Sequence, residues 1–257
     1  MNGAFYVGAI GLEAQQRALD TIANNISNVN TPAFKRSEVR FSEIVASRDD
    51  PVAPAAALGA ESFAPAGVLA DTLSMIDQPG KLQTTGNRGD VAIDGNGFIE
   101  VMGPGGQTLL WRGGHLKVGE DGMLATGQGF ALKAAITMPA DASAIEIGAD
   151  GVVRALVGDA QDAVEIGQIM LVTAPDVSGL RRLDGGFFQA DDALNLAEAR
   201  PGEDGTGLLV QGALEESNVE LTTEMVQLMM VQRAYAANAQ ILQAADQLMA
   251  IANSLRR

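Results

Sequence analysis

The C-terminal stretch from Ser217 to Ser254 constrains the fold most, because its apolar residues follow a heptad spacing without Gly or Pro. One heptad position holds Leu221, Leu228, Tyr235, Leu242 and Met249, and the position three residues further holds Val231, Asn238, Ala245 and Ala252. This pattern predicts one long helix whose apolar stripe needs a partner. At about 1.5 Å per residue the helix would be roughly 50 Å long. Ser217 and Glu220 have capping-box spacing, which predicts that the helix begins there.

The N-terminal stretch, residues 3–29, has a matching pattern. Its heptad positions hold Phe5, Leu12, Leu19 and Ile26, with Ile22 and Val29 on the companion position. Pro32 predicts that this helix ends near residues 28–30, since proline keeps the residue before it out of the helical region. We expect the two helices to pair as a coiled coil and to leave apolar surface for neighbouring molecules. Two ordinary amphipathic helices on one globular core fit the periodicity equally well.

Charge separates the ends of the chain from its middle. Residues 1–48 contain five basic and four acidic side chains, and residues 217–257 contain three of each, whereas the whole chain has a formal charge of −15. The middle is therefore acidic, which makes nucleic acid an unsuitable partner. The nearly neutral ends can pack against copies of themselves. The chain has no cysteine, which excludes disulfides and thiolate metal sites.

Targeting signals are not evident in the sequence. No apolar run approaches the length of a membrane span, so we expect no transmembrane segment. The first residues lack a charged region followed by an apolar run, so we expect no cleaved secretory signal.

The amino-acid composition changes twice in the middle of the chain. Residues 46–70 are rich in Ala and Pro, and we interpret 46–75 as a linker or extended insert. Beyond it, Gly- and Asp-rich turns at residues 94–97, 119–122 and 148–151 lie between short apolar runs and predict three hairpins. Val164–Thr173 reads as one longer strand, Gly185–Phe188 as a turn and strand, 198–207 as an exposed loop, and Leu208–Leu214 as a returning strand.

The predicted fold class is therefore α+β, with a central, mainly antiparallel β barrel or sandwich. We divide the chain into the N-terminal helix and following turn (1–45), the insert (46–75), the β-rich domain (76–216) and the C-terminal helix (217–257).

Catalytic chemistry finds little support in the sequence. His115 is the single histidine, and we expect it to have a structural or surface role. The Asp-Gly turns lack the alternating oxygen ligands of a calcium loop. Trp111 is expected in the core, and Met225, Met229 and Met230 are expected to pack against neighbouring molecules. We predict no catalytic residue, cofactor or metal site, and a hydrolase that uses His115 or paired carboxylates is the weakest alternative.

Three motifs carry a resemblance to a known family. Residues 22–36, Ile-Ala-Asn-Asn-Ile-Ser-Asn-Val-Asn-Thr-Pro-Ala-Phe-Lys-Arg, closely resemble the N-terminal signature of the bacterial flagellar rod and hook protein family. Residues 231–249 are similar to its C-terminal helix, and residues 90–98 to the start of its β-domain. The matching motif residues are Asn24, Asn25, Asn28, Thr31, Phe34 and Lys35. Ala33 stands where the family usually has Gly, which leaves open whether a left-handed turn forms at that position.

The resemblance implies a structural subunit and not an enzyme. Such subunits stack helically into a hollow shaft that transmits torque, with the terminal helices inside and the β-domains outside. The implied partners are copies of the chain, other rod proteins, hook protein, the surrounding ring proteins and the flagellar export apparatus. The implied location is the basal body across the periplasm, reached by type III export without signal cleavage. Phe41 to Val45 is similar to a short export cue of the family.

Within the family, the Gln-Arg-Ala-Tyr helix and the chain length are most similar to the distal rod member, and the proximal rod paralogue is the alternative. A non-flagellar β binding module on a coiled-coil stalk, recognising a ligand through loops such as 198–207, is a further alternative. The expected subunit-interface residues are Leu12, Leu19, Ile22, Ile26, Leu221, Leu228, Val231, Tyr235, Leu242 and Met249.

Overall fold

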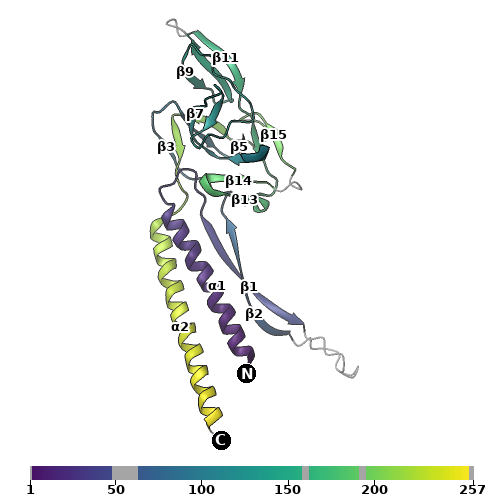
Figure 1. Ribbon diagram of the computed structural model, residues 1–257, viewed down its shortest axis with the longest axis vertical. Helices are drawn as coiled ribbons and strands as arrows, with labels where there is room; N and C mark the ends of the chain where they lie inside the picture. Colours follow the sequence, from purple (N-terminus) through teal and green to yellow (C-terminus); the bar gives the residue numbers. More distant parts are fainter. Residues whose placement is uncertain (1, 48–62, 158–161, 191–194, 255–257) are drawn as a thin grey trace, which may run out of the picture. The chain divides into compact units, whose positions relative to one another are not determined.

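The computed structural model describes residues 2–47, 63–157, 162–190 and 195–254 (Figure 1). It confirms an α+β fold with a helix near each end of the chain and a mainly antiparallel β region. The chain forms two compact units. The helical unit comprises Met1–Ser27, Ser37–Leu73 and Glu220–Arg257, and the β unit comprises Asn28–Arg36 and Ser74–Val219.

Two long helices dominate the helical unit. Helix α1 spans Asn2–Ser27 and helix α2 spans Leu221–Ser254, and they lie side by side in opposite directions (Figure 1). Helix α1 ends just before residue 28, as Pro32 predicts. Neither helix, over the residues described, is long and apolar enough to cross a membrane.

The predicted start of α2 at Ser217 is wrong. The Ser217 hydroxyl accepts a hydrogen bond from the Val219 amide at 3.3 Å, and α2 begins only at Leu221. Residues 217–219 are instead held within the β unit, where the amide of Asn218 donates to the carbonyl of Phe34 at 3.3 Å. These tertiary hydrogen bonds outweigh the local capping preference.

The contact stripe of α1 also differs from the predicted one. Its buried residues are Ala14, Ala18, Ile22 and Asn25, whereas Leu12, Leu19 and Ile26 are half-buried. Small residues on this stripe let α2 approach closely. A Cβ built on Gly8 would lie 2.5 Å from Leu242 Cδ1, so a larger residue at position 8 would require the end of the Leu242 side chain to move.

A two-stranded sheet completes the helical unit. Strand β1 spans Ser37–Ser47 and pairs with β2, which spans Phe63–Ser74. Both strands include residues that the sequence suggested were a linker or extended insert, and residues 48–62 lie outside the described residues. Residues 46–70 show no clean alternation of apolar and polar side chains, so this pairing was not predicted. The candidate export cue, Phe41–Val45, lies within β1.

Four sheets form the β unit, and their assigned pairings are antiparallel. The six-stranded sheet has the order β13 (Arg181–Arg182), β14 (Phe187–Gln189), β6 (Thr108–Trp111), β5 (Phe98–Met102), β12 (Leu171–Thr173) and β15 (Ala197–Ala199). The four-stranded sheet has the order β16 (Leu208–Gln211), β4 (Asp90–Asp94), β7 (Gly113–Val118) and β8 (Leu124–Thr126). The three-stranded sheet has the order β11 (Asp162–Gln168), β10 (Val152–Val157) and β9 (Ala142–Ile147), and β17 (Ala213–Glu215) pairs with β3 (Leu82–Thr84).

Two of the three predicted hairpins are confirmed. Strands β7 and β8 pair around residues 119–122, and β9 and β10 pair around residues 148–151. The hairpin predicted at residues 94–97 is wrong, because β4 and β5 belong to different sheets. Strand β16 pairs with β4 instead, and a Cβ on Gly95 would lie 2.8 Å from the Gly207 Cα. The glycine that suggested a tight turn therefore accommodates a crossing backbone.

Two predicted long strands are divided in the structure. Val164–Thr173 separates into parts of β11 and β12, which lie in different sheets. Leu208–Leu214 separates into β16 and β17 at Gly212, whose φ of 76° is left-handed. The loop predicted at 198–207 begins within β15, and Pro201 and Thr206 in it are buried. The turn and strand predicted at Gly185–Phe188 is confirmed by three 3-10 residues, Asp184–Gly186, followed by β14. Two further 3-10 turns span Pro104–Gly106 and Val177–Gly179.

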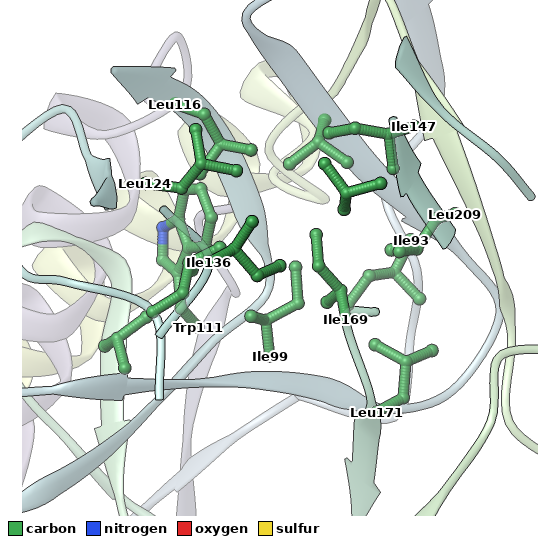
Figure 2. Close-up of a cluster of buried hydrophobic side chains, with 14 of the residues drawn as sticks. Ile93, Ile99, Trp111, Leu116, Leu124, Ile136, Ile147, Ile169, Leu171 and Leu209 are labelled. Carbon is green, nitrogen blue, oxygen red and sulfur yellow. The ribbon is translucent and has the colours of Figure 1, made fainter. Parts of the chain in front are cut away.

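The β unit encloses its own hydrophobic core (Figure 2). Trp111 lies in this core, as predicted, with an exposed fraction of 4%. Its buried neighbours include Ile93, Ile99, Leu116, Leu124, Ile136, Ile147, Ile169, Leu171 and Leu209, drawn from several sheets. A second, smaller cluster joins Phe98 and Phe188, whose ring centroids are 5.6 Å apart. The sheets are therefore held together by side chains that they share.

Candidate subunit interface

Helix α2 exposes an unusual amount of apolar surface. Its exposed large apolar side chains are Leu221, Met225, Val226, Met229, Met230, Tyr235, Ile241 and Ile251. Ile241 is 65% exposed. Only three charged residues occur along the helix, namely Glu224, Arg233 and Asp246, and the first is fully buried. A helix this poor in charge on its exposed side is typical of a protein interface.

The expected interface residues are distributed over three environments. Leu221 and Tyr235 are exposed, and Ile22 is buried. Half-buried positions are Leu12, Leu19, Ile26, Leu228, Val231 and Leu242, and the side chain of Met249 lies outside the described residues. The heptad analysis missed Val226, Ile241 and Ile251, which lie off the expected stripe. The small number of charged residues along the helix was the feature of the sequence that could have indicated these three exposed residues.

An apolar cavity lies within the helical unit. Its volume is about 150 Å³, and its walls come from α1, α2 and β1. Ile22, Val39, Met230 and Val231 contribute apolar side chains, and Phe41 lies at the same cavity while remaining 51% exposed. The expected export cue thus begins beside this cavity, and the side chain of Val45 lies outside the described residues.

Asn25 joins the three elements of the helical unit. Its Nδ2 donates to the Ser37 carbonyl at 2.8 Å and to Glu224 Oε2 at 3.2 Å, and its Oδ1 accepts from the Ser37 amide at 3.0 Å. Asn25 and Glu224 are both buried. Because its NH2 group and its carbonyl oxygen together make three hydrogen bonds in this way, Asn25 fixes α1 to β1 and to α2. The neighbouring motif residue Asn24 is exposed.

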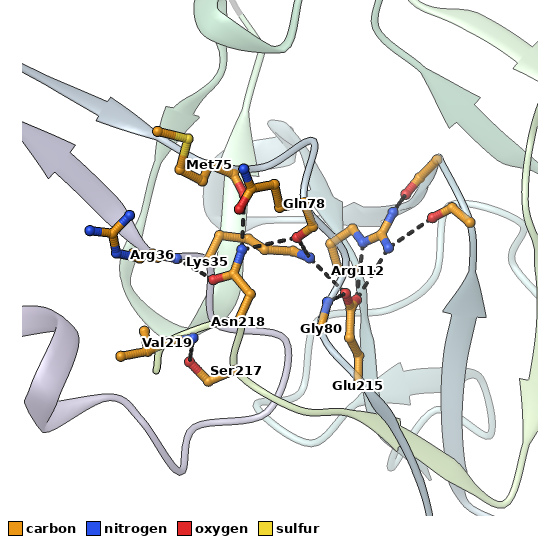
Figure 3. A network of polar contacts seen from close by, with 12 residues as sticks. Lys35, Arg36, Met75, Gln78, Gly80, Arg112, Glu215, Ser217, Asn218 and Val219 are labelled. Carbon is orange, nitrogen blue, oxygen red and sulfur yellow. Dashed lines mark hydrogen bonds and ion pairs between the residues drawn. The ribbon is translucent and has the colours of Figure 1, made fainter. Parts of the chain in front are cut away.

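The motif residue Lys35 belongs to a buried ionic cluster in the β unit (Figure 3). Its Nζ donates to Glu215 Oε1 at 2.6 Å and to the carbonyl of Gln78 at 2.8 Å. The same carboxylate oxygen accepts from the Gly80 amide at 2.8 Å. The other oxygen of Glu215 accepts from Arg112 Nε at 3.2 Å. One carboxylate therefore serves two buried cations, and we call Lys35, Arg112 and Glu215 the ionic cluster.

The cations of the ionic cluster have further partners. Arg112 also donates to the carbonyls of Gly97 at 2.8 Å and Gly95 at 2.9 Å. Burial lowers the pKa of Lys35 from its ordinary value, and the attraction of Glu215 opposes this shift. Arg112 and Glu215 were not predicted as site residues, because Glu215 is 180 positions from Lys35 and no local pattern connects them.

The turn between α1 and β1 is held by side chains and backbone together. Ala33 has a φ of 56°, so a left-handed turn forms there although the residue is alanine. Its amide donates to the carbonyl of Glu215 at 2.7 Å, which holds the strained residue in place. Phe34 is buried under Arg182, whose guanidinium carbon is 3.7 Å from the ring centroid. Thr31 Oγ1 donates to Asn28 Oδ1 at 3.2 Å. All four motif residues in this turn, including Lys35, therefore contribute to its structure.

Asn218 connects the turn to the chain that leads into α2. Its Oδ1 accepts from the Arg36 amide at 2.6 Å, and its Nδ2 donates to the carbonyls of Met75 and Gln78 (Figure 3). Three segments far apart in the sequence meet at this one side chain.

His115 lies in β7 opposite Asp90 of β4, so its ring makes a structural contact between two strands. Its Nδ1 lies 2.8 Å from Asp90 Oδ1, and the Thr85 hydroxyl donates to the other oxygen of Asp90 at 2.6 Å. The hydroxyl is thus directed at the carboxylate instead of the imidazole, unlike the nucleophile of a triad. Over the described parts of the chain, no group of three or more His, Cys, Asp or Glu residues could hold a metal ion.

Comparisons with known proteins agree with the motifs. The profile of the flagella basal body rod protein matches residues 5–35, that of the flagellar hook protein FlgE/F/G D1 domain matches residues 92–155, and that of the flagellar basal body rod FlgEFG protein C-terminal region matches residues 210–255. These matches include α1, the first strands of the β unit and α2.

Relatives that match over nearly the whole chain are also flagellar basal-body rod proteins. The flagellar basal-body rod protein FlgG of Buchnera aphidicola subsp. Baizongia pistaciae is 32% identical, with 96% of each chain covered. FlgG of Borreliella burgdorferi is 33% identical over the whole of both chains. The rod protein FlgF of Caulobacter vibrioides is 30% identical over 94% of this chain and 93% of its own. The chain therefore belongs to the flagellar basal-body rod protein family, and it is a structural component of the rod and not an enzyme.

Proposed function

We propose that the chain is the distal rod subunit and that it polymerises helically with its own copies into a hollow shaft. The row of exposed apolar residues on α2 carries this proposal. Met229, Met230 and Ile241 are each more than half exposed on a helix almost without charge. Burial of a few hundred Å² of such surface by a neighbour contributes several kcal/mol at about 25 cal/mol per Å². Part of this gain offsets the ordering of the two surfaces.

In the assembled shaft, we expect α1 and α2 to act as one coiled-coil pair. Their antiparallel contact and the small residues on the α1 stripe support this pairing. The expected interface residues half-buried within the chain, such as Leu228 and Val231, would then be covered completely by a neighbouring copy. Repeated lateral contacts of this kind allow a helical polymer to transmit torque.

The remaining assignments follow from family membership. The proposed partners are other rod proteins, hook protein, the surrounding rings and the flagellar export apparatus, with the rod crossing the periplasm. We expect export without signal cleavage, and Phe41 at the apolar cavity fits an export cue that is recognised before the cavity is filled. We propose that the helical unit, including the β1–β2 pair, forms the axial region and that the β unit forms the outer domain.

Substitution of Ile241 tests the assembly role. Ile241→Asp changes a side chain with few contacts inside the subunit, so the purified monomer should keep its helix content and unfolding midpoint. The variant should fail to enter rods, as seen in isolated basal bodies, and cells should not swim. Gln240→Asp, at the adjacent exposed position, is the matched control and should swim. Normal rods with Ile241→Asp would contradict the proposal.

The position along the rod requires a separate measurement. A label on this chain should appear in the part of the rod next to the hook. A label confined to the part next to the inner membrane would favour the proximal paralogue.

A further inference from the structure

The β unit carries an exposed basic segment on a sheet edge. Residues 81–88 include β3, and all eight are exposed. The segment contains Lys81 and Arg88 and no acidic residue, although the chain as a whole has a charge of −15. Neither of these cations forms an ion pair with any residue that the structure describes. We call residues 81–88 the basic edge.

The basic edge has a fixed conformation. Strand β3 pairs with β17 on one side, and its other side has no strand partner among the described residues. The carbonyl of Lys81 accepts from the Glu216 amide at 2.8 Å, and the carbonyl of Arg88 accepts from Gln211 Nε2 at 2.7 Å. Both ends of the segment are thus attached to the β unit, so the backbone that carries the two cations needs little further ordering on docking.

A surface of opposite charge occurs on the three-stranded sheet of the same unit. Residues 141–157 and 163–168 contain Asp141, Glu146, Asp150 and Glu165, against the single base Arg154. Glu146 and Glu165 flank Arg154 in the strand register and are exposed. Ile145 and Ile147 alternate with Glu146 and are buried, so Glu146 and Glu165 lie on the outer face. We call this face the acidic sheet.

We propose that the basic edge of one copy docks on the acidic sheet of a neighbouring copy. This inference rests on the proposed function, since it requires a polymer of this chain. The two surfaces are different patches of one unit, and β3 lies apart from β9 and β11 in Figure 1. Contacts between unlike patches are heterologous, and they generate open helical polymers instead of closed dimers. Opposite charge on the two patches favours this orientation over edge-to-edge contact of two like-charged strands.

Charge exchange tests the docking directly. The first variant is Lys81→Glu with Arg88→Glu, and the compensating variant adds Glu146→Lys with Glu165→Lys. Lys117→Glu with Arg200→Glu is the control, because it makes the same change of net charge at exposed positions elsewhere in the β unit. Each purified variant is first checked for an unchanged circular dichroism spectrum and unfolding midpoint. Rods per isolated basal body and swimming radius are then measured.

The first variant should lower the number of rods by about tenfold or more, because like charges then face each other. The compensating variant should recover at least about half of the rods, and the control should remain within about twofold of the unaltered protein. A first variant that assembles normally would overturn the proposal. So would a folded compensating variant that fails to recover, since the basic edge would then face another partner or only prevent strand aggregation.

The test separates this contact from the proposed function. If Ile241→Asp abolishes rods while the first charge variant does not, the rod assignment stands and the docking is wrong. If Ile241→Asp also assembles rods, the proposed role of α2 is wrong.

Discussion

The helical unit and the β unit differ in where their apolar surface is covered. The β unit buries large side chains from several sheets around Trp111 (Figure 2). Helix α2 leaves eight large apolar side chains exposed over its described length. The β unit thus completes its core within one chain, whereas the helical unit has apolar surface that other molecules can cover. Division of the chain in this way lets one unit fold before assembly and the other gain stability on assembly.

The two units also differ in their buried polar groups. The helical unit places one carboxylate, Glu224, beside the neutral amide of Asn25. The β unit places Glu215 between the cations Lys35 and Arg112. A buried charge without a partner destabilises a fold far more than a lost neutral hydrogen bond. Substitutions in the two clusters should therefore lower the free energy of unfolding by different amounts.

The largest effect is expected from Glu215→Ala. It leaves two buried cations and the Gly80 amide without their shared partner, and it should destabilise the β unit by about 3–5 kcal/mol. Urea unfolding followed by Trp111 fluorescence measures this change. Glu216→Ala, at the exposed neighbouring position, should change stability by less than about 0.5 kcal/mol. Equal effects of the two substitutions would show that the ionic cluster is not structurally important.

A smaller effect, confined to the helical unit, is expected from Asn25→Ala. The amide and carbonyl of Ser37 would lose their partner, at a cost of about 1–3 kcal/mol. Hydrogen exchange should become faster at Ser37 and along α1, while exchange in β4 and β5 should not change. The surface substitution Gln16→Ala should leave both units as they are. Faster exchange throughout the β unit would mean that the two units are not independent.

Substitution of an alanine by glycine should raise stability in the β unit and lower it in the helical unit. Ala33→Gly relieves a left-handed alanine, so it should stabilise the β unit by up to about 1 kcal/mol. Ala23→Gly, on the exposed face of α1, should destabilise the helical unit by about 1 kcal/mol. Calorimetry of the two variants measures both changes. Loss of stability with Ala33→Gly would show that packing of the buried methyl group outweighs the backbone strain.

The smallest effect concerns pH. Because burial lowers the pKa of Lys35, the native state binds fewer protons there than the unfolded chain between the folded pKa and 10.5. The free energy of unfolding of the unaltered protein should therefore increase as pH rises through that window, because of Lys35. Lys35→Met removes this contribution, so its stability should rise less steeply with pH. Urea midpoints at several alkaline pH values give the two slopes, and identical slopes would contradict the expectation.

Local patterns in the sequence predicted those elements whose own backbone hydrogen bonds join residues close together in the chain. The two helices and the hairpins at 119–122 and 148–151 are of this kind, because periodicity and turn residues act over a few positions. The failed hairpin at 94–97 shows the limit. Its glycines were interpreted as a tight turn, but Gly95 allows Gly207, the residue before β16, to pass close to the backbone. A strand more than a hundred positions away decided that conformation.

For the candidate interface, the sequence indicated the helix but not its exposed face. The heptad stripe included Leu242, which packs toward Gly8 of the same chain, and it omitted Ile241, which is the most exposed of these apolar residues. Which face of α2 meets α1 depends on the small residues of α1 that allow close approach. That choice is made by packing between two helices, which neither helix encodes alone.

The sequence by itself determined the class of the protein: the motifs at residues 22–36, 90–98 and 231–249 placed it in its family, and heptad spacing with low charge predicted assembly through the helices. Only the tertiary structure decided how Lys35, Arg112 and Glu215 share one buried site, and where the opposite charges of the β unit lie. The physical reason is that helix and turn preferences act between near neighbours, whereas buried ion pairs and surface patches depend on which distant segments the fold brings together.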